Sequence, residues 1–234
     1  MTIARRLTQL LDLLRYKLAT PRILSLETYA ERFGEIYRTG YWNRNGPRSG
    51  PGSTVEYTNM FRPQFEHTIT DLKIKSIFDA PCGDWTWMKE ISFPKELEYV
   101  GADIVGDMVT TLSQRHSRPG VSFRQFDIIT DAFPKVDVWL CRDCLFHLSN
   151  DHVKTALRSF LRSGSRFAFL TSHILDQPNS DIKTGDYRDL DLCQPPFNLP
   201  LPLRRLDDDP NLPARRFVGV WERNSITTAI GDLS

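Results

Sequence analysis

The 234-residue sequence is poor in cysteine and has almost no net charge. Its four cysteines are too few and too scattered for the disulfide framework of a small secreted domain, which favours a reducing, cytoplasmic location. Thirty lysines and arginines balance 29 aspartates and glutamates, so no overall field attracts nucleic acid. The composition argues against a secreted disulfide scaffold and against a nucleic-acid partner.

Long apolar runs are also absent. Over residues 3–18, leucines recur at i, i+3, i+4 and i+7, but arginine, lysine and aspartate interrupt them. This stretch is too charged for a signal-peptide core or a transmembrane span, and its spacing predicts an amphipathic helix. We expect that helix to pack on the domain or on another subunit of an oligomer; contact with a membrane surface is the alternative.

A third absence concerns glycine. Dinucleotide-binding proteins place a GxGxxG turn after the first strand, because glycines let backbone N–H groups approach a pyrophosphate. The corresponding stretch here is DAPCGDW, in which one glycine stands between Asp79 and Asp84, whose charges would repel phosphate. NAD or FAD is therefore a disfavoured rival ligand.

Helical patterns dominate the first part of the chain. After a break at Thr20-Pro21, apolar spacing over residues 26–37 predicts a second helix that Gly40 ends. A loop rich in glycine and proline follows, and residues 57–72 have the spacing of a long third helix. These segments form an N-terminal helical extension.

From Ser76 onward, short apolar runs alternate with helical patterns over residues 105–112 and 153–160. This alternation predicts a doubly wound, Rossmann-like α/β fold whose mostly parallel sheet carries helices on both faces. Residues 176–213, rich in proline and aspartate, are expected to cover the site. The strand-like runs are SIFDA, YVGADI, VSFRQFD, VDVWLC, RFAFLT and FVGVWER.

Acidic residues end three successive predicted strands: Asp79, Asp103 and Asp127. In open α/β sheets the ligand lies beyond the carboxyl ends of the strands, where these side chains meet. Each acid alone could be a helix cap. Together they supply acceptors for an ammonium group, ribose hydroxyls and an adenine amino group, which predicts a cationic nucleoside ligand.

These residues resemble the class I S-adenosylmethionine-dependent methyltransferases over about residues 45–222. FDAPCGDW is similar to their first motif, usually DxGxGxG, and CRDCLFHLS to the motif after strand four. The resemblance implies S-adenosylmethionine as cofactor and a seven-stranded sheet. It places Asp79 at the methionine amino group, Gly83 at a close backbone approach, Asp103 at the ribose hydroxyls and Asp127 at the adenine edge. It also assigns to the cofactor Pro81, Ile104, Ile128 and Arg142.

The first motif departs from the usual pattern, because Pro81 and Trp85 replace its first and third glycines. We expect Trp85 either to lie over the cofactor or to pack against the sheet. The loop NGPRSGPGS resembles a cofactor-covering segment. In it, Arg48 would pair with the methionine carboxylate and Ser53 would add a hydrogen bond, while Trp42 would shield the site from water. A solvated turn is the alternative for Arg48.

A narrower resemblance points to the acceptor. DAPCGDW, GADI, CRDCLFHLS and DIKTGDYR followed by PPF resemble a small bacterial group associated with glycan modification. The polar groups of DIKTGDYR suit a sugar or another small polar acceptor, with an exposed hairpin as the alternative. The predicted substrate-binding residues are Asp181, Thr184, Asp186 and Arg188.

Methyl transfer from a sulfonium is an in-line displacement, so alignment and exclusion of water do most of the catalysis. A hydroxyl acceptor also benefits from a general base, and the candidates at the strand ends are His147, Asp143 and His173. A purely structural role is the alternative for His147. No metal site is expected, because the CxxC pair Cys141 and Cys144 has no further ligand at zinc spacing.

The sequence thus predicts a methyltransferase that O-methylates a sugar or another small polar acceptor. The alternatives are a noncatalytic binding subunit that keeps the fold and a transferase that moves another group from a related nucleoside cofactor. We assign residues 1–53 to the helical extension with its covering loop and residues 54–234 to the methyltransferase domain.

Overall fold

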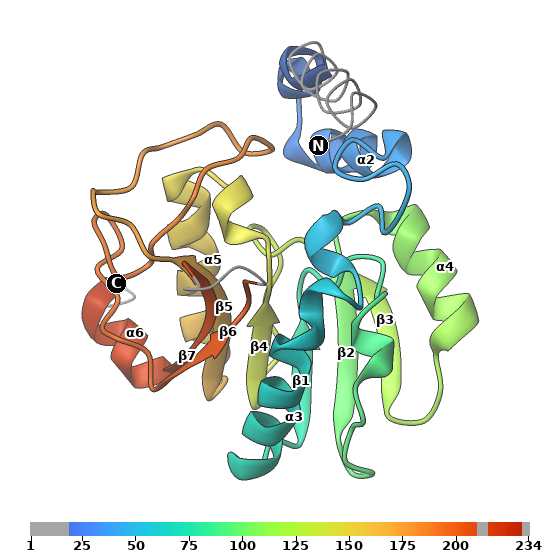
Figure 1. The fold of residues 1–234 in the computed structure, drawn as a ribbon, viewed down its shortest axis with the longest axis vertical. Coiled ribbons are helices and arrows are strands. Elements are labelled where there is room, and N and C mark those ends of the chain that lie inside the picture. Colours follow the sequence, from blue (N-terminus) through green and yellow to red (C-terminus); the bar gives the residue numbers. More distant parts are fainter. Residues whose placement is uncertain (1–18, 210–214, 231–234) are drawn as a thin grey trace, which may run out of the picture.

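The computed structural model describes residues 19–209 and 215–230, so the helix predicted over residues 3–18 lies outside the described residues. Seven strands form one sheet in the order β3-β2-β1-β4-β5-β7-β6 (Figure 1). The sheet is parallel except for β7, which runs antiparallel to β5 and β6, and this confirms the predicted fold class. The strands are β1 (Ser76–Asp79), β2 (Glu98–Asp103), β3 (Val121–Gln125), β4 (Val138–Cys141), β5 (Phe167–His173), β6 (Arg204–Asp207) and β7 (Arg216–Glu222).

Helices cover both faces of the sheet because its central strands are apolar on both sides. Successive side chains of a strand point to opposite faces. In β4, Val138 and Leu140 belong to the core under two of the helices, whereas Trp139 and Cys141 belong to the core under the other two. The first pair of helices is α3 (Phe61–Asp71) and α4 (Gly106–His116), and the second is α5 (Asn150–Ser163) and α6 (Arg223–Ile230).

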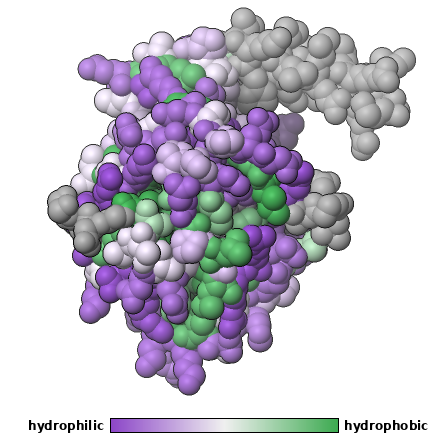
Figure 2. All heavy atoms as spheres, turned by 90° about the vertical axis from the view of Figure 1, so that its left-hand side faces the viewer, coloured by the Kyte–Doolittle hydropathy of each residue, from purple (hydrophilic) through white to green (hydrophobic). Residues whose placement is uncertain are grey.

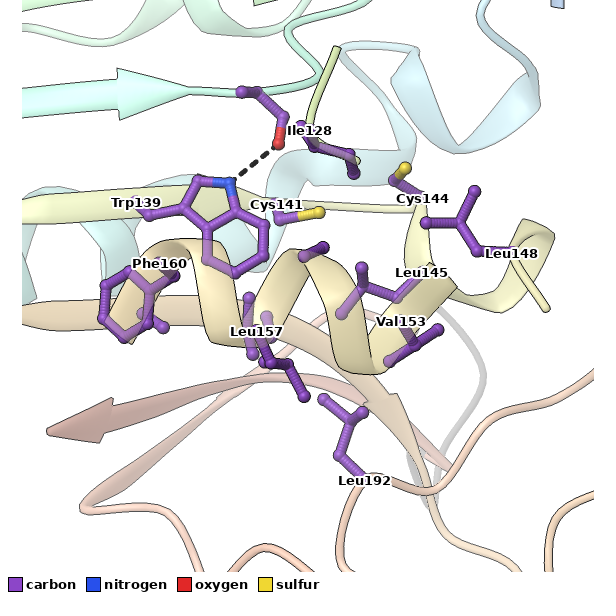
Figure 3. Close-up of a cluster of buried hydrophobic side chains, with 14 of the residues drawn as sticks. Ile128, Trp139, Cys141, Cys144, Leu145, Leu148, Val153, Leu157, Phe160 and Leu192 are labelled. Atoms are coloured by element: carbon purple, nitrogen blue, oxygen red, sulfur yellow. Dashed lines mark hydrogen bonds between the residues drawn. The ribbon is translucent and has the colours of Figure 1, made fainter. Parts of the chain in front are cut away.

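Trp139 lies at the centre of the core on the α5 face. Its fully buried ring packs beside Phe160 of α5, with ring centroids 5.5 Å apart (Figure 3). Its indole N–H donates a 2.9 Å hydrogen bond to the carbonyl of Ala80, in the loop that follows β1. The core therefore holds the start of the loop at the carboxyl edge of the sheet.

Helix α2 (Tyr29–Thr39) lies across the carboxyl ends of the strands, at the top of Figure 1. It begins after Thr28 because Thr28 and Glu31 form a capping box, in which each side chain accepts a hydrogen bond from the other residue's backbone N–H. Gly40 ends the helix as predicted, in the left-handed conformation with φ +59°.

Two predicted helix boundaries are wrong. Residues 19–25 are helical, so Thr20-Pro21 lies within a helical stretch. Proline is compatible with this because its ring fixes φ near the helical value. The long helix predicted over residues 57–72 is divided into a 3-10 turn, Tyr57–Asn59, and α3. Pro63 has no N–H for the carbonyl four residues before it, and its ring would clash there.

The segment between β5 and β6 runs along the outer edge of the sheet (Figure 1). Part of the predicted cover, residues 176–213, is the edge strand β6, which pairs with β7. Its sequence, RRLD, buries only Leu206, so it lacks the apolar pattern of a strand.

Figure 2 shows apolar patches among polar ones on this side of the molecule, and Leu201 and Leu203 of the segment are 73% and 55% exposed. Among the described helices, none has the length and apolar character needed to cross a membrane.

Replacing Trp139 by phenylalanine should lower the free energy of unfolding by about 2–4 kcal/mol, because it removes ring volume from a packed core and leaves the Ala80 carbonyl without its donor. Urea unfolding followed by circular dichroism measures the change. Leu201→Ala is the control: its side chain is 73% exposed, so a change within about 0.5 kcal/mol is expected. Equal losses in the two variants would contradict this role of Trp139.

Candidate functional site

A cavity opens beyond the carboxyl ends of β1, β2 and β4, between them and the segment that comprises α2 and the loop of residues 41–53. It holds about 950 Å³, including its open mouth. The fold thus gathers, around one space, most of the positions that the sequence assigned to cofactor binding or catalysis. These are Trp42, Arg48, Ser53, Asp79, Pro81, Gly83, Asp103, Ile104, Asp127, Ile128, Arg142, Asp143 and His147.

Asp79 ends β1 and is buried in the cavity wall. Burial raises the pKa of its carboxyl to about 8, although a hydrogen bond from the Tyr99 hydroxyl opposes the rise. That hydroxyl lies 2.5 Å from Oδ2 of Asp79, and no described residue donates to Oδ1. The second oxygen is therefore available to a donor in the cavity.

Asp103 ends β2 and is held by backbone donors. Its Oδ2 accepts a 3.1 Å hydrogen bond from the N–H of Gly83, and its Oδ1 accepts a 3.0 Å bond from the N–H of Val105. Burial raises the pKa of Asp103 to about 6, and these hydrogen bonds limit the rise. The carboxylate is consequently charged at neutral pH and fixed in orientation beside Asp79.

The loop after β1 makes direct contact with the loop of residues 41–53. Gly83 has φ +56°, and a Cβ at this position would lie 2.6 Å from the hydroxyl oxygen of Ser49. That oxygen accepts a 2.8 Å hydrogen bond from the N–H of Asp84. A glycine suits this position because the left-handed backbone disfavours a side chain and because Ser49 occupies the space that a Cβ would take.

Asp127, just after β3, is tied to α2. Its Oδ2 accepts a 2.7 Å hydrogen bond from the hydroxyl of Tyr29, and its Oδ1 accepts a 2.8 Å bond from the N–H of Ile129. Sequence reasoning did not identify Tyr29 as a site residue. Its spacing placed it on the apolar face of the second helix, but periodicity does not reveal that this face covers a cavity.

Trp85 and Arg48, which the sequence placed at the cofactor, both make contacts with other parts of the protein. Trp85 is 3% exposed and packs against Tyr99 and Phe123 of the sheet, outside the cavity lining. Arg48 lines the cavity, but its guanidinium donates hydrogen bonds of 3.3 and 3.0 Å to the carbonyls of Tyr37 and Arg38 at the end of α2. A contact between Arg48 and a methionine carboxylate stays a prediction.

Arg142 and Asp143, after β4, belong to a buried ion network. Arg142 lies 2.7 Å from Asp208 and 3.4 Å from Asp143, and Arg216 lies 3.3 Å from Asp143. Burial raises the pKa of Asp143, but the two arginines outweigh it and hold that pKa below its usual value. Because both arginines stabilise its charged form, Asp143 is a weak base.

His147 lies in the short 3-10 helix Leu145–His147 and stacks on Trp42, with ring centroids 4.5 Å apart. Its Nδ1 is 2.8 Å from the carbonyl oxygen of Asp186. Since a carbonyl can only accept, Nδ1 carries the proton and Nε2 keeps a lone pair. Burial lowers the pKa of His147 to about 4, so the ring is neutral at pH 7.

His173, the third base candidate, ends β5 away from the cavity lining. Its Nδ1 accepts a 3.1 Å hydrogen bond from the N–H of Leu190 and lies 3.3 Å from the carbonyl oxygen of the same residue, while Nε2 lies 3.5 Å from Asp189. The lone pair that a base needs is thus already engaged. Its catalytic role stays a prediction that this geometry does not favour.

The DIKTGDYR segment wraps around the start of α5 and does not contribute to the cavity lining; the same holds for all described residues of the predicted cover, 176–209. Asp181 accepts a 2.8 Å hydrogen bond from the N–H of Asn150, and the Thr184 hydroxyl accepts a 2.9 Å bond from the N–H of Ser149. Arg188 donates to the carbonyl of Leu148, and Asp186 binds His147 as described above. Their assignment to a substrate stays a prediction.

Metal ligands do not gather in the described part of the chain, where no group of three histidine, cysteine or acidic side chains is placed to hold an ion. All four cysteines are free. Cys144 and Cys82 nevertheless line the cavity, which the sequence did not indicate. Both side chains are buried, and burial raises the pKa of Cys82 well above its usual value, so the Cys82 thiol is a small apolar wall group.

No protein-family model matches the chain, and no curated protein matches it. Several solved structures, however, match the chain. PigF with SAH (S-adenosylhomocysteine) is 12% identical with a TM-score of 0.58; the match covers 84% of this chain and 62% of PigF, so the chain spans less than two thirds of that protein. The methyltransferase SibL, solved in its apo form, is 14% identical with a TM-score of 0.53, covering 91% of this chain and 73% of SibL.

A third structure is the 1,6-didemethyltoxoflavin-N1-methyltransferase of Burkholderia thailandensis, with 1,6-didemethyltoxoflavin and S-adenosylhomocysteine bound. It is 17% identical with a TM-score of 0.54, and the match covers 82% of this chain and 86% of that one. At these identities the likeness concerns the fold. The chain has the fold of S-adenosylmethionine-dependent methyltransferases.

Replacing Trp42 by alanine should raise the pKa of His147 from about 4 by at least about one unit, because it re-exposes a ring whose burial is the main cause of the low value. Titration of the imidazole ¹⁵N resonances measures the pKa and also reports the tautomer. Leu203→Ala, at a side chain 55% exposed and outside the cavity lining, should leave the titration unchanged. An unchanged pKa in Trp42→Ala would show that burial is not the cause.

Proposed function

We propose that this protein is an S-adenosylmethionine-dependent methyltransferase. The observation that carries the proposal is the pair of buried carboxylates, Asp79 and Asp103, in a cavity of a fold whose solved neighbours include proteins with SAH bound. A scaffold gains nothing from two acids buried at neighbouring strand ends, because burial of a charge is costly without a partner. A cationic ligand that carries hydroxyl groups supplies that partner.

The donor and acceptor atoms of the cavity fit this cofactor. Oδ1 of Asp79 lacks a donor from the described residues and would accept from the methionine ammonium. Asp103 would accept from the ribose hydroxyls, and Asp127, with Ile128 beside it, would border the adenine. The raised pKa values of Asp79 and Asp103 are consistent with a site built to receive positive charge and hydrogen-bond donors.

The bound sulfonium would supply an activated methyl group to an acceptor held in line with it. Phe33 of α2 and Trp42 of the 41–53 loop line the cavity as apolar walls, where they would exclude water from the reacting atoms. His147 would take the acceptor's hydroxyl proton on Nε2, since that nitrogen keeps its lone pair. Its low pKa keeps it in the base form at all pH values well above 4, at the cost of a lower basicity than that of an exposed imidazole.

The acceptor that we propose is a hydroxyl of a sugar or of another small polar molecule. His147 supports an oxygen acceptor, because an uncharged amine would need no base. The resemblance of DIKTGDYR and its companion motifs to a glycan-modifying group supports the sugar. A reducing, cytoplasmic setting, proposed from the cysteine content, is in keeping with four free thiols.

A noncatalytic binding subunit is the second candidate. Ser49 favours it, because its hydroxyl fills the space beside Gly83 where the family places a close approach to the cofactor. The two candidates differ in turnover. Transfer of a labelled methyl group to monosaccharides, oligosaccharides or small hydroxylated molecules supports the enzyme; binding of S-adenosylmethionine without transfer to any of them supports the subunit.

Calorimetry should detect binding of S-adenosylmethionine and SAH to the purified protein. Asp103→Ala should weaken both at least about tenfold, because it removes a charged acceptor from the ribose position. Asp107→Ala is the control, since Asp107 lies exposed in the first turn of α4, outside the cavity lining. The affinity of this variant for either compound should stay within about twofold of that of the unaltered protein. Absence of binding to either compound would contradict the proposed function.

A further inference from the structure

Tyr99 is a buried phenol that the reaction described above does not use. It lies in β2 with 1% exposure, among the apolar residues on the α3 and α4 face of the sheet. A buried tyrosine hydroxyl needs a hydrogen-bond partner, because leaving it unpaired is costly. Its partner is Oδ2 of Asp79, 2.5 Å away.

The strand register makes this contact possible. Tyr99 lies opposite Ile77, whereas the residue opposite Asp79 is Gly101. A Cβ at Gly101 would lie 2.7 Å from the Phe123 ring and 3.2 Å from Cε1 of Tyr99. The missing side chain therefore leaves room for both rings, and the Tyr99 ring can lean along the sheet toward Asp79. The sequence YVGAD thus places a hydroxyl donor beside the acid that ends the neighbouring strand.

The surroundings of Asp79 make this single donor important. Burial raises the pKa of Asp79 and the nearby Asp103 raises it further, while Tyr99 and the more distant charge of Arg142 lower it. The thiols of Cys82 and Cys141 are also close, and burial keeps both protonated. Among these groups, only the Tyr99 hydroxyl donates a hydrogen bond to the carboxylate.

We propose that Tyr99 is a positioning residue for the cofactor's amino group. Its hydrogen bond fixes Oδ2 of Asp79, turns Oδ1 toward the cavity and stabilises the carboxylate in the charged form that an ammonium group requires. This inference rests on the proposed function, because it assumes that the ligand of the cavity carries such an ammonium group.

A specific pH dependence follows. In the free protein Asp79 holds a proton below about pH 8, and an ammonium ligand must displace that proton to bind the anion. Affinity for SAH therefore rises as the pH approaches 8. Without the hydroxyl of Tyr99 the pKa of Asp79 is higher still, so the same rise shifts to higher pH.

The test compares two ligands in Tyr99→Phe, which keeps the ring and its packing. SAH carries the amino-acid part, whereas 5′-methylthioadenosine has the nucleoside and the sulfur but no ammonium group. Tyr99→Phe should weaken SAH about tenfold or more near pH 7, since each pKa unit corresponds to a factor of ten, and should leave 5′-methylthioadenosine within about twofold. Tyr187→Phe, at a side chain 57% exposed and outside the cavity lining, should change neither affinity.

A double-mutant cycle with Asp79→Asn completes the test. In the Asp79→Asn background, Tyr99→Phe should cause no further loss of SAH affinity, because the two residues act through one carboxylate. An equal loss of both ligands in Tyr99→Phe, no loss of either, or additive losses in the cycle would overturn the inference. Failure of the unaltered protein to bind either ligand would instead overturn the proposed function.

Discussion

The burial of two carboxylates at the edge of the sheet is the constraint on which the site depends. Asp79 and Asp103 end neighbouring strands, and burial raises the pKa of both. Buried charges are tolerated only where donors surround them. Here the donors are the hydroxyl of Tyr99 and the N–H groups of Gly83 and Val105. The site therefore has two acid side chains already fixed in place for a cationic ligand: Asp103, which is charged at neutral pH, and Asp79, which holds a proton below about pH 8.

The segment over the cavity is joined to the sheet by a few specific contacts. Tyr29 of α2 binds Asp127, and Ser49 of the 41–53 loop binds the backbone of Asp84. Arg32, buried in α2, donates a 2.8 Å hydrogen bond to the carbonyl of Thr184. The DIKTGDYR segment thus connects α2 with the start of α5, and its Asp186 carbonyl sets the tautomer of His147. Helix α2, the DIKTGDYR segment and His147 are therefore parts of one packed unit.

The sequence predicts well what depends on short-range pattern. The main strands and the convergence of Asp79 and Asp103 follow from apolar runs and from the rule that places sites at carboxyl ends. The sequence does not predict features that depend on packing between segments far apart in the chain. The edge strand β6 buries one residue and has no apolar pattern. Tyr29 resembles any apolar-face residue of a helix, and only the fold shows that the face covers a cavity. The contacts of the polar DIKTGDYR residues with the start of α5 are likewise visible only in the fold, and their assignment to a substrate stays a prediction.

The most direct test of the central claim is a crystal structure of the protein grown with SAH. The account predicts the ligand in the cavity beneath α2, with its amino group within hydrogen-bond distance of Oδ1 of Asp79 and its ribose hydroxyls at Asp103. The hydrogen bond from Tyr99 to Oδ2 should persist. A ligand bound elsewhere, or bound in the cavity with its amino group away from Asp79, would contradict the claim that the buried carboxylates form the cofactor site.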